Sequence, residues 1–527
     1  MKKIMVMFLL VFCIFSFLYP SQLEERIDSI SRLEMQSVVE FLAHDLVEGR
    51  APGTRGGNIT EIYLKSVFKL LDLKPETNGK YLQPFKLKGF TINNLNVQID
   101  DHKLKYLEDI VGTFTQGAES FSLEGDAVFI GFGIVADLWN WDDYKNTDVK
   151  DKIVISRIND PGMFLSDIFE GKTLTYFGRW TYHIEEVARR GAAGIIMIHT
   201  DESAGYGWKV VQNSWSGEEV FIESDLSSNL KFRAWVKESR LRQIFKDRDL
   251  DLDQLYKMSL KRTFKPVTLG FKVKIDGKNS FRKLSNNNVI AVIPGKTSKR
   301  VVFSAHIDHF GVDENKQGDN IFNGAIDNGT AVASMVMVAK ILKEFQNDLY
   351  YTVTFLACNS EEAGLLGSKF YVQNTDRGTI VANINFESTP VWEKSRSIMG
   401  IGARFSSFED ILKFLAQKEG IKYRQFSMSN QGFFYRSDQF SFARYDIPSV
   451  WISAGEDDES GERKYTQFWK TRYHTVEDEY DPRWKLEGMK QTIKFALLLI
   501  DHLNRNKMVP QWRDKLTFPM ESVRYKH

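Results

Sequence analysis

Cysteine and proline are scarce in this chain, and its charges nearly cancel. The 527 residues include two cysteines and twelve prolines. Two cysteines cannot form a disulfide-stapled scaffold, so stability must come from a hydrophobic core, which a chain of this length can build. Seventy Lys and Arg against sixty-nine Asp and Glu leave a net charge of +1. That balance offers no basic surface for nucleic acid and no polybasic stripe for a membrane.

Internal repeats, low-complexity tracts and Pro/Ser-rich linkers are also missing. Hydrophobic residues make up 43% of the chain and charged residues 26%, which excludes wholesale disorder and a protein with many membrane spans. At about 150 residues per domain, the length predicts two to four domains.

One long apolar run is present, at the N-terminus. Lys2 and Lys3 precede an apolar stretch at 4–19 that only Ser16 interrupts. As a helix it would span about 24 Å, less than the hydrocarbon core of about 30 Å. The pattern predicts a signal peptide over 1–22 and a secreted or periplasmic, that is extracytoplasmic, protein. The alternative is a retained N-terminal anchor, and otherwise we expect no membrane span in the mature chain.

The rest of the chain changes twice in the pattern of its hydrophobic residues. Helical spacing covers 23–73 and is interrupted by a Gly- and Arg-rich stretch at 48–57, which we interpret as an ordered interdomain loop. From about 125, short strands alternate with a helix that Gly191 ends; these elements are expected at 127–130, 152–155, 180–190 and 194–198.

From about 288, apolar runs alternate with long helical stretches. The runs are at 289–293, 301–304, 351–356 and 450–452, and the helices are expected at 331–345, 408–418 and 485–503. Near-continuous apolar runs are typical of strands buried on both faces. The alternation therefore predicts an α/β sheet covered by helices on both sides.

Imidazole and carboxylate groups follow these buried runs. His306 and Asp308 come after one run, the pair Glu361 and Glu362 after another. Three more residues lie in comparable places: Asp327, Glu387 and His474. If the sheet is parallel, all of them meet at the edge where open α/β sheets bind ligands. Imidazole and carboxylate without thiolate suit Zn²⁺ or a similar cation, and Cys358 is interpreted as a spectator thiol.

Taken singly, each of these signals is weak, and their order along the chain makes them specific. The stretches are SAHIDH (304–309), GAIDNGT (324–330), NSEEAGLLGS (359–368), INFE (384–387), RSDQF (436–440) and YHTVED (473–478). With them the chain resembles the zinc-dependent M28-type metallopeptidases, chiefly aminopeptidases. The stretches EGRAPGTRGG (48–57), GFGI (131–134), WDDY (141–144) and RRGAAG (189–194) resemble the subgroup with an inserted protease-associated (PA) domain.

The resemblance implies a fold and a domain arrangement. The fold would be a mixed, largely parallel sheet with helices on both faces, the zinc-exopeptidase fold, plus an inserted β-rich α/β PA domain. The peptidase domain would be discontinuous, over 23–115 and 266–510. The PA insert would cover 116–265, and 511–527 would form a C-terminal tail.

The resemblance also implies two Zn²⁺ ions per chain. His306 and Glu387 would bind the first ion, Glu362 and His474 the second, and Asp327 would bridge both. Many members carry Asp where Glu387 stands. A shared carboxylate can hold two cations about 3.5–4 Å apart, so that both polarise one water.

Two further residues receive catalytic roles by the same resemblance. Glu361 would be the general base, since a carboxylate outside the coordination sphere can pass a proton from water to the leaving amine. Asp308 would orient His306 as a carboxylate partner that fixes the imidazole tautomer.

Three functions remain open at this point. The first is a secreted dinuclear zinc aminopeptidase acting on peptides or proteins. The second is a zinc-dependent glutaminyl cyclase or a carboxypeptidase on the same fold, which the ligand set alone does not distinguish. The third is a non-catalytic scaffold, although here every ligand position carries a competent side chain. Oligomeric state and side-chain preference are left open.

Overall fold

The chain folds into two compact units. The computed structural model describes residues 22–76, 79–115, 119–223, 230–314 and 316–521. Unit 1 comprises the residues up to Pro84 together with Asn286–Phe426 and Ser437–Arg513, and unit 2 comprises Phe85–Ser285, Ser427–Arg436 and the residues from Asp514. The expected signal peptide lies, except for its last residue, outside the described residues.

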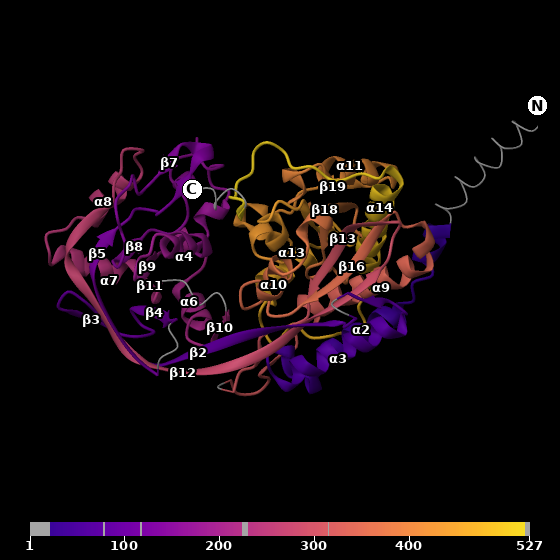
Figure 1. Cartoon of the computed structure of the whole chain (residues 1–527), viewed down its shortest axis with the longest axis horizontal. Coiled ribbons are helices and arrows are strands. Elements are labelled where there is room, and N and C mark those ends of the chain that lie inside the picture. Colours follow the sequence, from indigo (N-terminus) through magenta and orange to yellow (C-terminus); the bar gives the residue numbers. More distant parts are fainter. Residues whose placement is uncertain (1–21, 77–78, 116–118, 224–229, 315, 522–527) are drawn as a thin grey trace, which may run out of the picture. The chain divides into compact units, whose positions relative to one another are not determined.

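A mixed sheet with a parallel centre runs through unit 1 (Figure 1). Its strand order is β19-β18-β20-β17-β13-β16-β12. The four strands β20, β17, β13 and β16 run parallel, whereas β18 and β12 pair with them antiparallel. The carboxyl ends of the four parallel strands therefore lie at one edge of the sheet.

Most of the expected elements of unit 1 are present. Its strands are β1 (Lys74–Pro75), the last part of β12 (Val267–Ile293), β13 (Thr297–His306), β14 (Gly311–Val312), β15 (Ile321–Phe322), β16 (Tyr351–Cys358), β17 (Ile380–Asn385), β18 (Ser397–Ile401), β19 (Lys422–Arg424) and β20 (Ser449–Ala454). Its helices are α2 (Arg32–Leu42), α3 (Arg55–Leu70), α9 (Ala331–Glu344), α10 (Leu366–Gln373), α11 (Phe408–Lys418), α12 (Gln439–Ala443), α13 (Lys464–Thr471) and α14 (Glu487–Asn506). The predicted α/β alternation is confirmed.

Helices cover both faces of this sheet. Because side chains alternate along a strand, Val302, Leu356 and Cys358 share one face, where they pack with Tyr371 of α10 and Phe442 of α12. Helix α9 contacts β13, and α14 contacts β20. The segment 325–344 is the one described helix long and apolar enough to cross a membrane, but 94% of its most apolar window is buried within the protein. It is accordingly a core helix.

The strands of unit 2 pair in the order β12-β5-β8-β9-β11-β4. Strands β5, β8, β9 and β11 run parallel. Helix α4 (Trp180–Arg189) contacts β9 and ends before Gly191, whose φ of +71° is left-handed. This confirms the strand–helix–strand unit expected there.

The other bounds in unit 2 complete its description. The strands are β2 (Leu82–Ile99), β3 (His102–Leu104), β4 (Ile110–Phe114), β5 (Ser120–Phe129), β6 (Val135–Ala136), β7 (Trp141–Asp142), β8 (Ile153–Ser156), β9 (Gly194–His199), β10 (Glu219–Ile222) and β11 (Phe232–Lys237). The helices are α5 (Asp201–Ala204), α6 (Trp208–Ser214), α7 (Glu238–Lys246) and α8 (Leu252–Ser259).

The two units divide the chain at other places than the domain bounds expected from the sequence. Residues 85–115 and 266–285, expected in the peptidase domain, belong to unit 2. The reason is that β2 and β12 are long strands that begin in one unit and end in the other. The bounds of the PA insert, 116–265, stay a prediction.

Candidate metal centre

The residues expected as ligands come from five segments of unit 1. His306 is the last residue of β13, and Glu362 and Glu387 follow the ends of β16 and β17. Asp327 lies in the turn η6 (Ala325–Thr330) before α9, and His474 lies in the loop after α13. Since β13 pairs in parallel with both β16 and β17, the residues at these strand ends come together.

Asp327 divides its two carboxylate oxygens between two groups of side chains. Its Oδ1 is 3.2 Å from Nε2 of His306, and its Oδ2 is 3.2 Å from Nε2 of His474. In the first group, Glu387 Oε1 is also 3.2 Å from the nitrogen of His306. In the second, Glu362 Oε2 is 3.4 Å from the nitrogen of His474. The five side chains thus form two clusters that share one carboxylate.

These separations fit atoms that bind a common cation. Donor atoms about 2.0–2.1 Å from a tetrahedral zinc are about 3.3 Å from one another. Asp327 Oδ2 and His474 Nε2 lie 3.2 Å apart, yet both are buried without a hydrogen-bond partner among the described residues. Buried polar atoms of this kind are costly unless a third group binds them. The donor set of imidazole nitrogen and carboxylate oxygen fits zinc.

The crowding of buried carboxylates agrees with a cation site. Burial raises the pKa of Glu362 to about 8 and also raises that of Glu387. Burial opposes the ionisation of Asp327 as well, but the imidazoles of His306 and His474 hold its pKa well below the usual range. Carboxylates this close oppose each other's ionisation, and a divalent cation relieves that repulsion.

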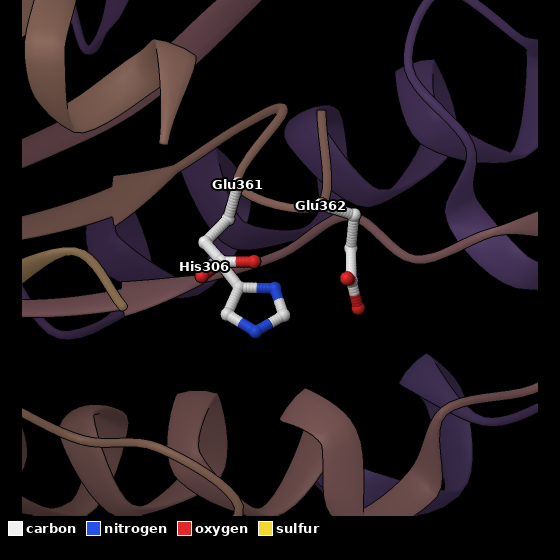
Figure 2. Close-up of side chains that lie close together, drawn as sticks. All are labelled: His306, Glu361 and Glu362. Carbon is white, nitrogen blue, oxygen red and sulfur yellow. The ribbon is translucent and has the colours of Figure 1, made fainter. Parts of the chain in front are cut away.

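Glu361 lies next to the clusters with its carboxylate directed differently from that of Glu362 (Figure 2). One ligand atom each from His306, Glu361 and Glu362 lie within 4.8 Å of one another. Among the described residues, however, Glu361 has no contact within 4.0 Å to an imidazole nitrogen, unlike the members of the two clusters. Burial raises the pKa of Glu361 well above its ordinary value.

Asp308 is close to His306, but the contact differs from the expected one. The Nδ1 atom of His306 is 3.1 Å from the backbone carbonyl oxygen of Asp308 and 3.9 Å from its carboxylate. The carboxylate instead accepts the backbone N–H groups of Glu361, at 2.9 Å, and Glu362, at 3.2 Å. The main chain of Asp308 therefore holds the imidazole of His306. Its side chain holds the backbone of Glu361 and Glu362.

Two other residues hold ligands in place, and sequence reasoning gave them no role. Asp478 accepts the backbone N–H groups of Ile326, at 3.0 Å, and Asp327, at 2.9 Å. The hydroxyl of Ser437 donates to Glu387 Oε2 at 2.6 Å. Both residues lie inside stretches that carry the family resemblance. The sequence therefore pointed to these positions, but it did not indicate that they hold the ligands in place.

Arg50 corrects the interpretation of the 48–57 loop as an interdomain segment. The loop lies within unit 1 and leads into α3. The guanidinium of Arg50 is buried and donates to the carbonyl oxygens of Ile307, at 2.9 Å, and Gly324, at 3.0 Å, as well as to those of Leu42 and Asn323. Arg50 thus connects the loops that carry His306 and Asp327. These contacts join residues too distant in the sequence to be predicted.

A network of buried amides holds the turn before Glu361. Asn288 accepts the backbone N–H of Asn359 at 3.1 Å, and Asn286 donates to the Ser360 hydroxyl at 2.8 Å. Glu61 of α3 accepts from the Asn359 side chain at 2.9 Å. Ser360 has a left-handed φ of +63°, a conformation that needs support from its surroundings. Nothing in the Asn-rich run at 286–288 marks it in the sequence as part of the site.

His309 also lies at the centre, beside Glu362, and the sequence indicates no role for it. Its Nδ1 lies 2.8 Å from Glu362 Oε1, and burial lowers the pKa of its ring to about 4. The other histidines that the structure describes are not in contact with either cluster; they are His44, His102, His183, His199 and His502.

Residues 288–498 match the model of peptidase family M28. No sequence among the curated proteins matches the chain. Among solved structures, an aminopeptidase from Aneurinibacillus sp. strain AM-1 is similar with a TM-score of 0.51 at 14% identity, over 94% of this chain and 98% of that one. This likeness shows a shared fold.

Two further structures give lower scores. The zinc aminopeptidase BSAP from Bacillus subtilis has a TM-score of 0.45 at 16% identity, over 93% of this chain and 98% of that one. A peptidase M28 precursor from Shewanella amazonensis SB2B has a TM-score of 0.45 at 17% identity, over 94% of this chain and 97% of that one.

Proposed function

We propose that the chain, whose residues 288–498 match the model of peptidase family M28, is a metal-dependent hydrolase of that family and an aminopeptidase with two zinc ions. The observation that carries the proposal is the division of the Asp327 carboxylate between the His306 and His474 clusters. One oxygen for each cluster is the arrangement that a bridging ligand requires.

In this proposal the five ligands keep the roles that the resemblance implied. His306 and Glu387 would bind one ion, Glu362 and His474 would bind the other, and Asp327 would belong to both. Zinc supplies a Lewis acid that polarises the scissile carbonyl and lowers the pKa of water.

Glu361 acts as the general base. Its buried carboxylate takes a proton from the attacking water and delivers it to the leaving amine. The separation of this residue from the two clusters supports a proton-transfer role. Asp308 holds Glu361 in position by accepting a hydrogen bond from its backbone N–H.

The charges near the centre favour a substrate amine over a substrate carboxylate. A carboxypeptidase needs a free cation for the α-carboxylate of its substrate. Arg50 interacts with Asp308, Asp327 and Glu362, but its guanidinium is already used by four carbonyl oxygens. An α-ammonium group finds buried carboxylates here instead, which supports an aminopeptidase.

The setting of the enzyme is proposed on the sequence pattern. We propose that the PA-type insert expected over 116–265 lies within unit 2, and the parallel strands and the helix α4 there support this. The N-terminal apolar run directs the chain out of the cytoplasm. The substrates are peptides or proteins outside the cytoplasm.

The test is a substrate scan on the full mature chain with metal analysis in parallel. Aminoacyl anilides, N-blocked peptides with a free carboxyl end and N-terminal glutaminyl peptides are offered separately. Release of N-terminal residues by protein with about two zinc ions per chain is expected. Ring closure of glutamine would favour the cyclase, release from the carboxyl end would favour the carboxypeptidase, and inactivity with empty metal sites would favour the scaffold.

A further inference from the structure

We propose that His309 is a positioning residue that occupies one oxygen of Glu362, so that this glutamate presents a single oxygen to the second cluster. The inference rests on the proposed function, because it assumes that Glu362 is a metal ligand. It concerns a side chain that neither the ligand set nor the general base includes.

The two oxygens of Glu362 have different neighbours. Oε1 is 2.8 Å from Nδ1 of His309, whereas Oε2 is 3.4 Å from Nε2 of His474. The first distance is that of a good hydrogen bond. The second is close to the separation of about 3.3 Å expected for two donors to one zinc. One oxygen is therefore used by the protein, and the other is directed toward the cluster.

The direction of the hydrogen bond follows from the chemistry of the acceptor. A carboxylate that binds a metal is ionised and can only accept hydrogen bonds. The hydrogen must then be on Nδ1 of His309, which donates it to Glu362. The other ring nitrogen has no hydrogen-bond partner among the residues that the structure describes, so the contact with Glu362 is the ring's polar anchor.

The imidazole of His309 is held rigidly enough to impose this geometry. The ring is fully buried, and a Cβ added to Gly324 would lie 2.6 Å from its Cδ2 atom. Gly324 has a φ of +58°, and its carbonyl oxygen accepts from Arg50. The backbone of Gly324 thus fixes one side of the ring, while Phe310 packs with a ring-centroid distance of 4.9 Å.

The consequence is a restricted mode of ligation. A free carboxylate can bind a cation with one oxygen or with both. Because His309 holds Oε1, Glu362 is limited to Oε2, and one coordination position is left for water or substrate. Catalytic zinc sites need such an open position, and partners outside the ligand set commonly change metal affinity by about 10–100-fold.

The experiment compares two variants of the full chain. His309→Asn keeps an N–H donor near the position of Nδ1, whereas His309→Leu keeps apolar volume without a donor. Metal-free protein is titrated with Co²⁺ alone, and the visible spectrum and the affinity of each binding step are recorded. X-ray absorption counts the imidazole ligands per cobalt.

The expected result is a selective effect on one binding step. His309→Leu should weaken one step by about 10–100-fold and lower its visible absorption, because a second oxygen of Glu362 raises the coordination number. His309→Asn should restore wild-type affinity and spectrum, and the imidazole count should stay unchanged in both variants.

Several results would overturn the assignment. Wild-type binding and spectrum in His309→Leu would show that the hydrogen bond has no such effect. Equal damage in both variants would assign the effect to packing, and loss of one imidazole would make His309 a ligand. If His309→Leu does not fold, the Nδ1 proton of wild-type protein is sought by nitrogen-15 histidine labelling, and its absence would refute the proposal. Failure of the proposed function looks different, since the wild-type chain would then not bind a second cobalt.

Discussion

In unit 2, Asp143 and Asp160 are as deeply buried as His306 and Asp327 of unit 1, with 1% and 0% exposure. Each of their oxygens nevertheless accepts a hydrogen bond. For Asp160 the donors are the backbone N–H of Gly162, at 2.9 Å, and the hydroxyl of Thr175, at 2.6 Å. Asp143 accepts from the Trp141 ring at 2.9 Å and from a backbone N–H.

The carboxylates of the metal centre have different neighbours. Asp327 faces two imidazoles, and its Oδ2 has no hydrogen-bond partner among the described residues. Glu387 and Glu362 lie beside the same imidazoles. Here the polar atoms point to shared positions, whereas in unit 2 each carboxylate is satisfied within its own loop.

The comparison shows which property indicates function. Burial raises the pKa of Asp143 and of Asp160 to about 7, and it raises that of Glu362 to about 8. A shifted pKa therefore does not separate a structural carboxylate from a ligand. The contacts of the carboxylate separate the two cases. Hydrogen-bond donors from the same loop indicate a structural role, whereas converging atoms that could bind a metal and lack a hydrogen bond indicate a cation site.

The largest effect is expected for Glu361→Gln. The amide keeps the size of the side chain but cannot accept the proton of the attacking water, so kcat should fall by about 10²–10⁴-fold. Zinc content should stay near the wild-type value, because base and ligands are separate residues. Steady-state kinetics and elemental analysis of the same preparation measure both quantities.

Asp143→Asn serves as the control for that variant. It alters a carboxyl group that is also buried, but in unit 2, and it should leave both kcat and zinc content unchanged. A Glu361→Gln protein that lost its metal along with its activity would remove the distinction between base and ligand.

The second effect concerns metal content. His474→Ala removes one imidazole from the second cluster, so the chain should retain about one of the two proposed ions. The matched change His199→Ala removes a buried imidazole of unit 2, whose Nε2 contacts the Tyr206 carbonyl oxygen at 3.0 Å. That variant should keep its zinc. Equal zinc content in the two variants, measured by elemental analysis, would exclude His474 as a ligand.

The same comparison explains what the sequence could predict. The strands β13, β16 and β20 were predictable because burial on both faces leaves apolar runs, and His306 and Glu362 were considered together because they follow such runs. Arg50 and His309 received no role because their roles depend on contacts with residues far away in the chain. The compact units divide the chain at other places than the predicted domain bounds because β2 and β12 run from one unit into the other.

The smallest effect is expected from Asp160→Asn, which should change the stability of unit 2 and not its chemistry. Burial raises the pKa of Asp160 to about 7, so the folded state holds its proton more tightly than the unfolded state. The stabilisation is complete below the unfolded pKa of about 3.9 and is lost as the pH rises through about 7. Asparagine does not ionise, and so the variant should lose part of this decline. Hydrogen exchange of the β8 and β9 amides at pH 5 and 8, corrected for intrinsic rates, measures the difference, and an unchanged pH dependence would contradict the assignment.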